Sequence, residues 1–221
     1  MKVQHNKPIS AFGGINFVFE YLEKNNIGSL FNDSLPSLKN QSKYQWSDII
    51  NSILSIYMCG GDCIEDLHTH LKNHFSGNPY VKIPSPDTVL KRLSELAQDN
   101  QTCRTKRGTV DHMYNINPGM DQLNLSLLKK LGVFNSGEVT LDYDNTILFN
   151  EKEDSKMTYK RNHGYQPGVC TVNEDHVLYI ENRNGNSDAK SFQAETLGRL
   201  FKLLKNNNIK VIDHFRADAA F

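Results

Sequence analysis

Residues 139–149, VTLDYDNTILF, decide the fold, because they combine an apolar run typical of a β-strand with two aspartates two positions apart. Side chains alternate between the two faces of a strand, so Asp142 and Asp144 are predicted to lie on the same face. Neighbouring carboxylates repel one another and raise each other's pKa unless a cation neutralises them. The stretch therefore predicts either a cation site on a core strand, or a strand in which a bulge or an exposed face turns one aspartate to solvent.

The residues around and after this stretch predict the order β-β-β-α-β. Extended segments are expected within 156–172 and over 176–185, and both contain glycines typical of turns. Residues 187–208 predict a long helix, capped by Ser187 or Asp188. The side chains expected to face inward from it are Phe192, Leu197, Leu200, Phe201 and Leu204. Residues 209–221 predict a buried strand that carries Asp213 and Asp218, and alternation places these two aspartates on opposite faces.

Before residue 135 the sequence predicts helices. Apolar residues recur at helical spacing in four segments, 15–26, 47–58, 85–97 and 117–132. Three of these helices are expected to have polar caps, namely Ser47, Ser85 and Asn117, with Pro86 and Pro118 at first helical positions and Gly132 as a terminator. The change of pattern predicts two domains, a helical one over 1–135 and a mixed α/β or α+β one over 136–221.

Composition limits the functional classes only broadly. The chain has 221 residues, 38% hydrophobic and 23% charged, with a formal net charge of +0, which suits a soluble globular protein. Neutrality does not exclude a local basic patch for nucleic acid. The first residues lack the layout of a secretory signal, and no apolar run reaches the length of a membrane span. Four cysteines do not form a dense framework, so thiols in a reducing cytoplasm are expected.

Two known families share the pattern around the paired aspartates. LDYDNT, residues 141–146, resembles the D-x-D-x-T motif of haloacid-dehalogenase phosphatases, in which Asp142 would be the nucleophile and Asp144 the acid and base. That family opens its domain with the motif and continues into a doubly wound parallel sheet. Here about 135 residues precede the motif and further strands are predicted after it, so the phosphatase is the lesser alternative.

The sequence also resembles DDE-type transposases of bacterial insertion sequences, and this resemblance covers more of the chain. The segments that carry it are LDYDNT, then NHGYQPGV at 162–169, ENRNGNSDAKSF at 181–192 and FRADAAF at 215–221. Upstream, IPSPDTVLKRLSEL at 83–96 is similar to the helical N-terminal DNA-binding region of this group. The order of the segments is more specific than any one of them.

The resemblance implies a helical DNA-binding region followed by a partial ribonuclease-H-like catalytic domain. It implies that Asp144 and Asp218 are catalytic residues that bind Mg²⁺ or Mn²⁺, with Asp142 as a neighbour or alternate. The implied reaction is phosphodiester hydrolysis at the ends of the element, followed by strand transfer. The implied partner is double-stranded DNA, both the terminal inverted repeats and the target, and a homodimer is allowed; the protein would associate with the nucleoid when bound.

The family also requires a third acid, a glutamate on a helix downstream of the second aspartate, and the chain ends at Phe221. We therefore expect this chain to be an N-terminal piece of a transposase that cannot transpose DNA alone. A DNA-binding remnant that binds element ends without cutting them is the alternative.

Several basic residues are candidates for contacts with DNA. The helix at 86–97 resembles a recognition helix, with Lys91 and Arg92 toward DNA; an ordinary amphipathic helix is the alternative interpretation. The cluster CRTKRG suggests phosphate contact, although it also fits a solvated loop. The full set of candidates for nucleic-acid binding is Lys91, Arg92, Arg104, Lys106, Arg107, Arg183 and Arg216.

A structural zinc site is a further alternative. Cys59, Cys63, His70 and His74 have a spacing within the range of zinc ligands. The same segment also predicts a helix whose inner face is apolar, and in that case the histidines need no metal.

Overall fold

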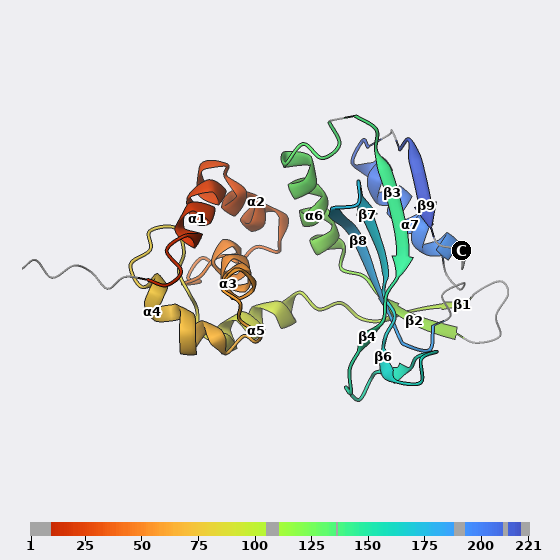
Figure 1. The fold of residues 1–221 in the computed structure, drawn as a ribbon, viewed down its shortest axis with the longest axis horizontal. Coiled ribbons are helices and arrows are strands. Elements are labelled where there is room, and N and C mark those ends of the chain that lie inside the picture. Colours follow the sequence, from red (N-terminus) through yellow and green to blue (C-terminus); the bar gives the residue numbers. More distant parts are fainter. Residues whose placement is uncertain (1–9, 105–110, 136, 188–192, 210–211, 218–221) are drawn as a thin grey trace, which may run out of the picture. The chain divides into compact units, whose positions relative to one another are not determined.

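The computed structural model describes residues 10–104, 111–135, 137–187, 193–209 and 212–217. The chain forms two compact units, Met1–Ala97 and Gln98–Phe221. Within the described ranges, every helix is too short or too polar to span a bilayer. The architecture is mixed α+β, with helices in the first unit and two sheets with helices in the second (Figure 1).

The first unit is helical, as its sequence predicts. Its elements are α1 (Ile15–Lys24), α2 (Ile27–Ser34), α3 (Trp46–Met58), the π-helix η1 (Leu67–Leu71), α4 (Lys72–Phe75) and α5 (Pro86–Glu95). They bury one apolar side each, and the buried side chains include Phe19, Ile27, Phe31, Trp46, Ile49, Ile56, Leu67, Leu71, Phe75 and Val89. The apolar spacing in the sequence therefore corresponds to a common core for these helices.

The helix caps agree with the sequence in two cases and differ in one. Ser85 caps α5 and accepts the amide of Thr88. Asn117 caps α6 (Pro118–Lys130) and accepts the amide of Met120. The prediction of Ser47 was wrong, because α3 begins at Trp46 with a capping box between Gln45 and Asp48. A reciprocal pair of side chains satisfies two amides at once, which a single serine does not.

The second unit is built on a six-stranded sheet. Its strands are β1 (Gln101–Arg104), β2 (Asp111–Asn115), β3 (Thr140–Asn145), β7 (Gly168–Val172), β8 (His176–Arg183) and β9 (His214–Ala217), in the spatial order β1-β2-β8-β7-β3-β9. β9 pairs parallel to β3, and the other neighbours pair antiparallel. With α7 (Gln193–Asn206) between β8 and β9, the predicted β-β-β-α-β order is confirmed for β3, β7, β8, α7 and β9.

A small three-stranded sheet extends the hairpin between β3 and β7. It consists of β4 (Leu148–Phe149), β5 (Lys156–Met157) and β6 (His163–Tyr165), in the order β4-β6-β5. The backbone comes close to itself at the base of this sheet, where Gly185 donates its amide to the carbonyl of Gly164 at 3.0 Å. The small sheet therefore starts where the paired aspartates end and returns to the main sheet through Pro167.

The division between the units falls at Ala97, whereas the change of sequence pattern suggests 135. The difference has two causes. β2 pairs with β8 through Tyr114 and Arg183, so the β1–β2 hairpin belongs to the sheet. α6 packs its Leu125 and Leu128 into the same core as α7. A helical pattern in a sequence does not indicate which core the helix joins.

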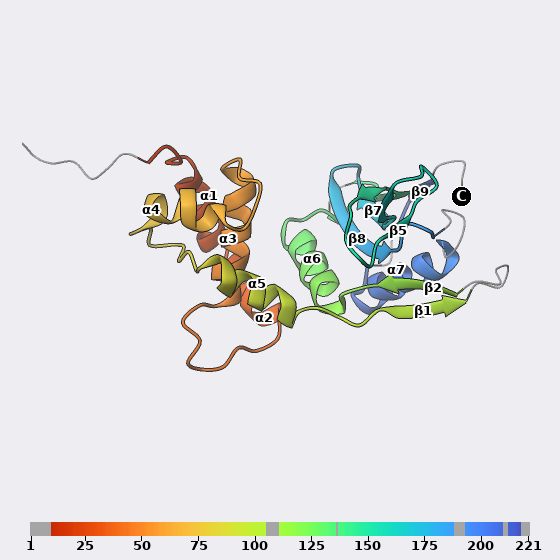
Figure 2. The same cartoon turned by 90° about the horizontal axis from the view of Figure 1, so that it is seen from below.

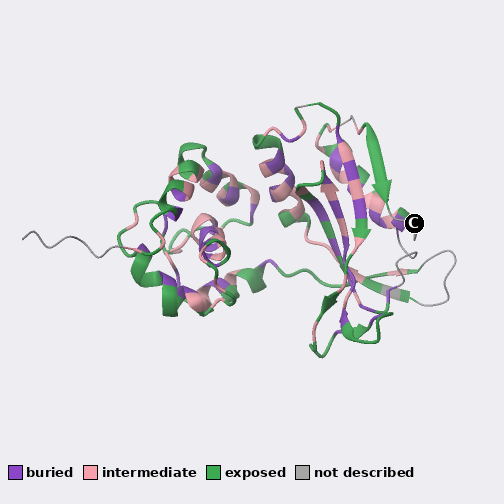
Figure 3. Ribbon diagram, in the orientation of Figure 1, coloured by how far each residue is buried: buried purple, intermediate pink, exposed green. Residues whose placement is uncertain are grey.

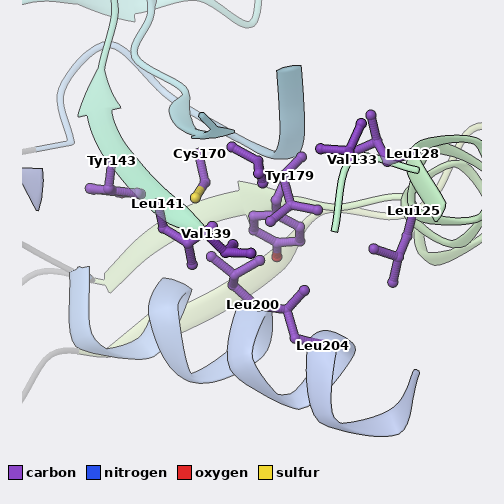
Figure 4. Close-up of a cluster of buried hydrophobic side chains, with 12 residues drawn as sticks. Leu125, Leu128, Val133, Val139, Leu141, Tyr143, Cys170, Tyr179, Leu200 and Leu204 are labelled. Atoms are coloured by element: carbon purple, nitrogen blue, oxygen red, sulfur yellow. The ribbon is translucent and has the colours of Figure 1, made fainter. Parts of the chain in front are cut away.

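α6 and α7 cover one face of the sheet (Figure 2). On β3, alternation directs Leu141 and Tyr143 toward these helices, where they are 0% and 3% exposed. Figure 4 shows the resulting core, whose buried members also include Leu125, Leu128, Val133, Val139, Cys170, Tyr179, Leu200 and Leu204. The face of β3 that carries Asp142 and Asp144 is consequently the opposite one.

Two expectations about burial were wrong. Phe201, expected to face the core, is 43% exposed on α7, whereas Leu200 and Leu204 fill the core as predicted. β9, expected to be a buried strand, is exposed along all four residues (Figure 3). Among the described strands β9 pairs with β3 alone and stands at the edge of the sheet, which leaves its side chains open to solvent. Phe192 and Asp188 lie outside the described residues.

The half-buried Asp121 in the first turn of α6 makes the stability of this core dependent on pH. Burial, with a smaller contribution from the charge of Glu181, raises the pKa of Asp121 to about 7. The folded state therefore binds a proton that the unfolded state has lost, and stability falls as the pH rises from the ordinary range of an aspartate toward 7. Replacing Asp121 with asparagine removes this loss.

We expect Asp121→Asn to gain about 1–2 kcal/mol of unfolding free energy relative to the wild type between pH 5 and pH 8, measured by urea denaturation. Asp87, which is exposed in the first turn of α5, provides the matched control. Its asparagine variant should keep a constant difference from the wild type over this range. A constant difference for Asp121→Asn as well would contradict the prediction.

Candidate metal and nucleic-acid site

Asp142 and Asp144 lie side by side on one face of β3, as the alternation predicts. β3 pairs with β7 in continuous register over residues 141–145, so no bulge turns either aspartate away. Leu141 and Tyr143 are buried on the other face, while Asp142 is half-buried and Asp144 is exposed. The two carboxylates line a shallow hollow of about 410 Å³ whose walls include Thr146, Val169, Thr171 and Arg216.

The two aspartates differ in their partners. Asp142 stands opposite Arg216 in the parallel β3–β9 pair. The Arg216 guanidinium contacts both oxygens of Asp142, with Nη2 2.9 Å from Oδ2, and also donates to Glu174 at 2.6 Å. These hydrogen bonds, the larger part from Asp142, raise the pKa of Arg216. The chain itself thus supplies a cation for Asp142.

Asp144 is arranged differently. Its Oδ1 accepts the amide of the next residue, Asn145, at 2.7 Å. Across the β3–β7 pair it faces Val169, a residue with no charge. Exposed carboxylate oxygens are the ligands that Mg²⁺ and Mn²⁺ prefer, and Mg²⁺ needs only one or two carboxylates because it keeps several waters. The donor chemistry of Asp144 therefore fits a divalent cation, and that of Asp142 is already engaged by Arg216.

Beneath the aspartates, on the α7 face of the sheet, lies a buried polar network. Glu181 on β8 is 0% exposed and accepts two hydrogen bonds of 2.8 Å from Arg199 on α7. Arg183 donates to Thr196 at 2.8 Å and also contacts the hydroxyl of Tyr143. Arg199 lies over the ring of Tyr114, 4.2 Å from its centroid. The network links β8, α7, β3 and β2.

The expectation that Arg183 contacts phosphate is corrected by this burial. Arg183 is 2% exposed, and its Nε lies 3.4 Å from Glu181. Alternation along β8 turns both residues to the α7 face, where each satisfies the other. Glu181 and Arg183 stand at alternate positions in ENR, and two charges so spaced in an apolar strand are the pattern of a buried pair. That pattern is the signal by which Glu181 could have been found.

The other predicted basic residues have varied surroundings. Lys91 is exposed on α5. Arg92, on the same helix, binds Glu95 at 2.6 Å and Ser42 at 3.2 Å. Arg104 pairs with Asp111 across the β1–β2 hairpin at 3.3 Å. Lys106, Arg107 and Asp218 lie outside the described residues.

The zinc alternative finds little support near η1. Cys59, His70 and His74 border a hollow of about 360 Å³ together with Asp66. His74 is 3.3 Å from the hydroxyl of Ser10, and Asp66 accepts the amides of Asp62 and Cys63. In the part of the chain that the structure describes, no group of three or more His, Cys, Asp or Glu residues is arranged to hold a metal ion.

Comparisons with known proteins give little further information. No family model and no curated protein matches the chain. Among solved structures, the chain is similar to one described as "Crystal structure of the mariner Mos1 paired end complex with Mg". The match covers 96% of this chain and 72% of that chain, with 14% sequence identity and a TM-score of 0.23. The similarity to that transposase is therefore weak, and a likeness of this size carries no argument about fold or function.

Proposed function

We propose that the second unit is a ribonuclease-H-like catalytic domain of the DDE-transposase type, and that the chain acts on DNA. The observation that carries the proposal is the parallel pairing of β3 with β9. This pairing sets the segments LDYDNT and FRA side by side, with β7 and β8 antiparallel beyond β3. Asp144 lies on β3, and Asp218 follows β9 in the sequence; acidic residues used as a pair suit phosphodiester chemistry supported by divalent cations.

In this proposal Asp144 and Asp218 hold Mg²⁺ or Mn²⁺. When bound, the metal would polarise the phosphodiester and lower the pKa of an attacking hydroxyl or water. Asp144 is suited to this role by its exposure and by the amide of Asn145, which holds one carboxylate oxygen. Asp142 instead orients Arg216 across the strand pair. Arg216, 52% exposed in its side chain, is then placed to contact a DNA phosphate beside Asp144.

The phosphatase alternative is less well supported. A carboxylate nucleophile attacks through an oxygen that is free to approach phosphorus, and both oxygens of Asp142 are engaged by Arg216. The sheet around it is mixed, with an antiparallel neighbour at β7, and is not the doubly wound parallel sheet of that family.

We propose DNA contacts for the helical unit as well, through Lys91 on α5, and for the segment around Arg104.

The test measures metal binding and DNA binding rather than strand cleavage. Free Mn²⁺ is followed by its electron paramagnetic resonance signal as protein is added, and duplex DNA binding by gel shift. We expect Asp144→Asn to weaken Mn²⁺ binding more than about tenfold, because a ligand contributes at least as much as the groups that orient it. DNA binding should survive both Asp144→Asn and Asp218→Asn.

Asp175, exposed in the turn between β7 and β8, provides the control, and Asp175→Asn should bind Mn²⁺ as the wild type does. Unchanged Mn²⁺ binding in Asp144→Asn would refute the metal site. DNA binding with no Mn²⁺ binding by the wild type would identify a DNA-binding remnant. Hydrolysis of p-nitrophenyl phosphate that disappears in Asp142→Asn would favour the phosphatase.

A further inference from the structure

We infer that Arg183 is a positioning residue for Asp144, acting from the opposite face of the sheet through Tyr143 and Asn145. The inference rests on the proposed function, because it concerns how the proposed metal ligand is held. Arg183 is 2% exposed, so we expect any effect on the site to pass through its contacts with other residues.

The contacts run in an unbroken series from Arg183 to the carboxylate. Arg183 Nη2 contacts the Tyr143 hydroxyl, and Nη1 lies 3.4 Å from Oδ1 of Asn145. The Tyr143 hydroxyl donates to the same Asn145 oxygen at 3.4 Å. The backbone amide of Asn145 then donates to Oδ1 of Asp144 at 2.7 Å. Tyr143 and Asn145 flank Asp144 in the sequence, so Arg183 holds the strand on both sides of it.

The position of Arg183 is itself fixed by its surroundings. Thr196 on α7 accepts from Nη2 at 2.8 Å, and Glu181 supplies the opposing charge. Gly168, which pairs with Asn145 across β3–β7, provides the space. A Cβ at Gly168 would lie 2.7 Å from Nη2 of Arg183 and would overlap the Tyr143 hydroxyl. A side chain at this position would therefore displace the groups that hold Asp144.

This arrangement has the form of an outer-shell support for a metal ligand. Groups that orient a ligand without touching the metal typically contribute 10- to 100-fold in metal affinity. Here two polar side chains fix the Asn145 side chain, and the orientation of its peptide determines where the Asp144 carboxylate points. A planar guanidinium can reach Tyr143, Asn145 and Thr196 together, whereas a lysine ammonium cannot present the same fork.

The experiment measures Mn²⁺ affinity by the same resonance titration for Tyr143→Phe and Arg183→Lys. Tyr143→Phe removes only the hydroxyl, and Arg183→Lys keeps the charge. We expect each to weaken Mn²⁺ binding about tenfold. Leu200→Ala is the matched control. Leu200 lies on α7 in the same core but is not part of the series of contacts from Arg183 to Asp144. Its replacement should therefore leave the Mn²⁺ affinity of the folded protein unchanged.

The results separate the inference from the proposed function. Wild-type Mn²⁺ affinity in both variants, with binding lost in Asp144→Asn, would overturn the inference and leave the metal site standing. Equal weakening in Leu200→Ala would also overturn it, because general loosening would then explain the effect. Unchanged Mn²⁺ binding in Asp144→Asn would contradict the proposed function itself, on which the inference rests. Should Arg183→Lys fail to fold, Tyr143→Phe, which alters one atom, decides the question.

Discussion

Replacing Glu181 with glutamine is expected to lower the free energy of unfolding of the second unit by about 3–5 kcal/mol. Glu181 is fully buried and is the carboxylate shared by Arg183 and Arg199, whose side chains are 1% and 24% exposed. The glutamine keeps the shape but removes the charge, so two guanidinium groups face each other without a counter-ion. The loss is a large part of the 5–15 kcal/mol that stabilises a typical domain. Urea denaturation followed by circular dichroism measures it.

Two comparisons test the cause of this loss. In Glu181→Leu combined with Arg183→Met, both buried charges are removed, and most of the stability should return because an apolar replacement avoids the desolvation of the pair. Glu20→Gln breaks an exposed pair with Lys24 and should cost less than about 1 kcal/mol. A cost for Glu181→Gln as small as that for Glu20→Gln would show that the network is hydrated in solution.

Replacing Gly185 with alanine is expected to cost about 3 kcal/mol or to detach the small sheet from β8. An added Cβ would overlap the carbonyl oxygens of Lys156 and Gly164 and would lie 2.8 Å from Cγ2 of Thr158. Two of these three neighbours are backbone atoms, which cannot rotate away. The amide of Gly185, which donates to Gly164, should then exchange with deuterium much faster than in the wild type.

Gly198→Ala is the matched control for Gly185→Ala, because Gly198 has free space around it. It is exposed on α7, and an added Cβ would meet nothing within 4 Å. Because glycine weakens a helix interior, Gly198→Ala should raise the free energy of unfolding by about 0.5–1 kcal/mol. If Gly185→Ala also raised the free energy of unfolding, the role assigned to Gly185 would be contradicted.

The parts of the fold that follow from local chemistry could be predicted from the sequence. Ser85 and Asn117 cap their helices because each side chain accepts the backbone amide three residues further along the chain, so these bonds need no distant partner. The placement of Asp142 and Asp144 on one face of β3 follows from alternation alone. The pairing of β9 with β3, by contrast, does not follow from any local pattern.

The parts that depend on distant contacts could not be predicted. The burial of Arg183 depends on α7, which brings Thr196 to Arg183 and Arg199 to Glu181. The alternate spacing of the charges at 181 and 183 indicates a buried pair, but it does not indicate these partners. The pairing of Asp142 with Arg216 depends on the register of two strands far apart in the sequence. The exposure of β9 depends on its place at the edge of the sheet, whereas the apolar residues within 209–221 suggest an interior strand.

The parallel β3–β9 pair also has a consequence for the order of folding. Asp142 and Arg216 are 74 positions apart, while β3, β7 and β8 are joined as successive strands of the sheet. Closing so long a loop costs more chain entropy than forming the nearer pairs, so β9 should join the sheet late. Until then, β3 presents an unpaired edge, and an open edge can pair with another chain. During synthesis, the strand that carries the aspartates is thus exposed to misassembly through this edge until β9 pairs with it.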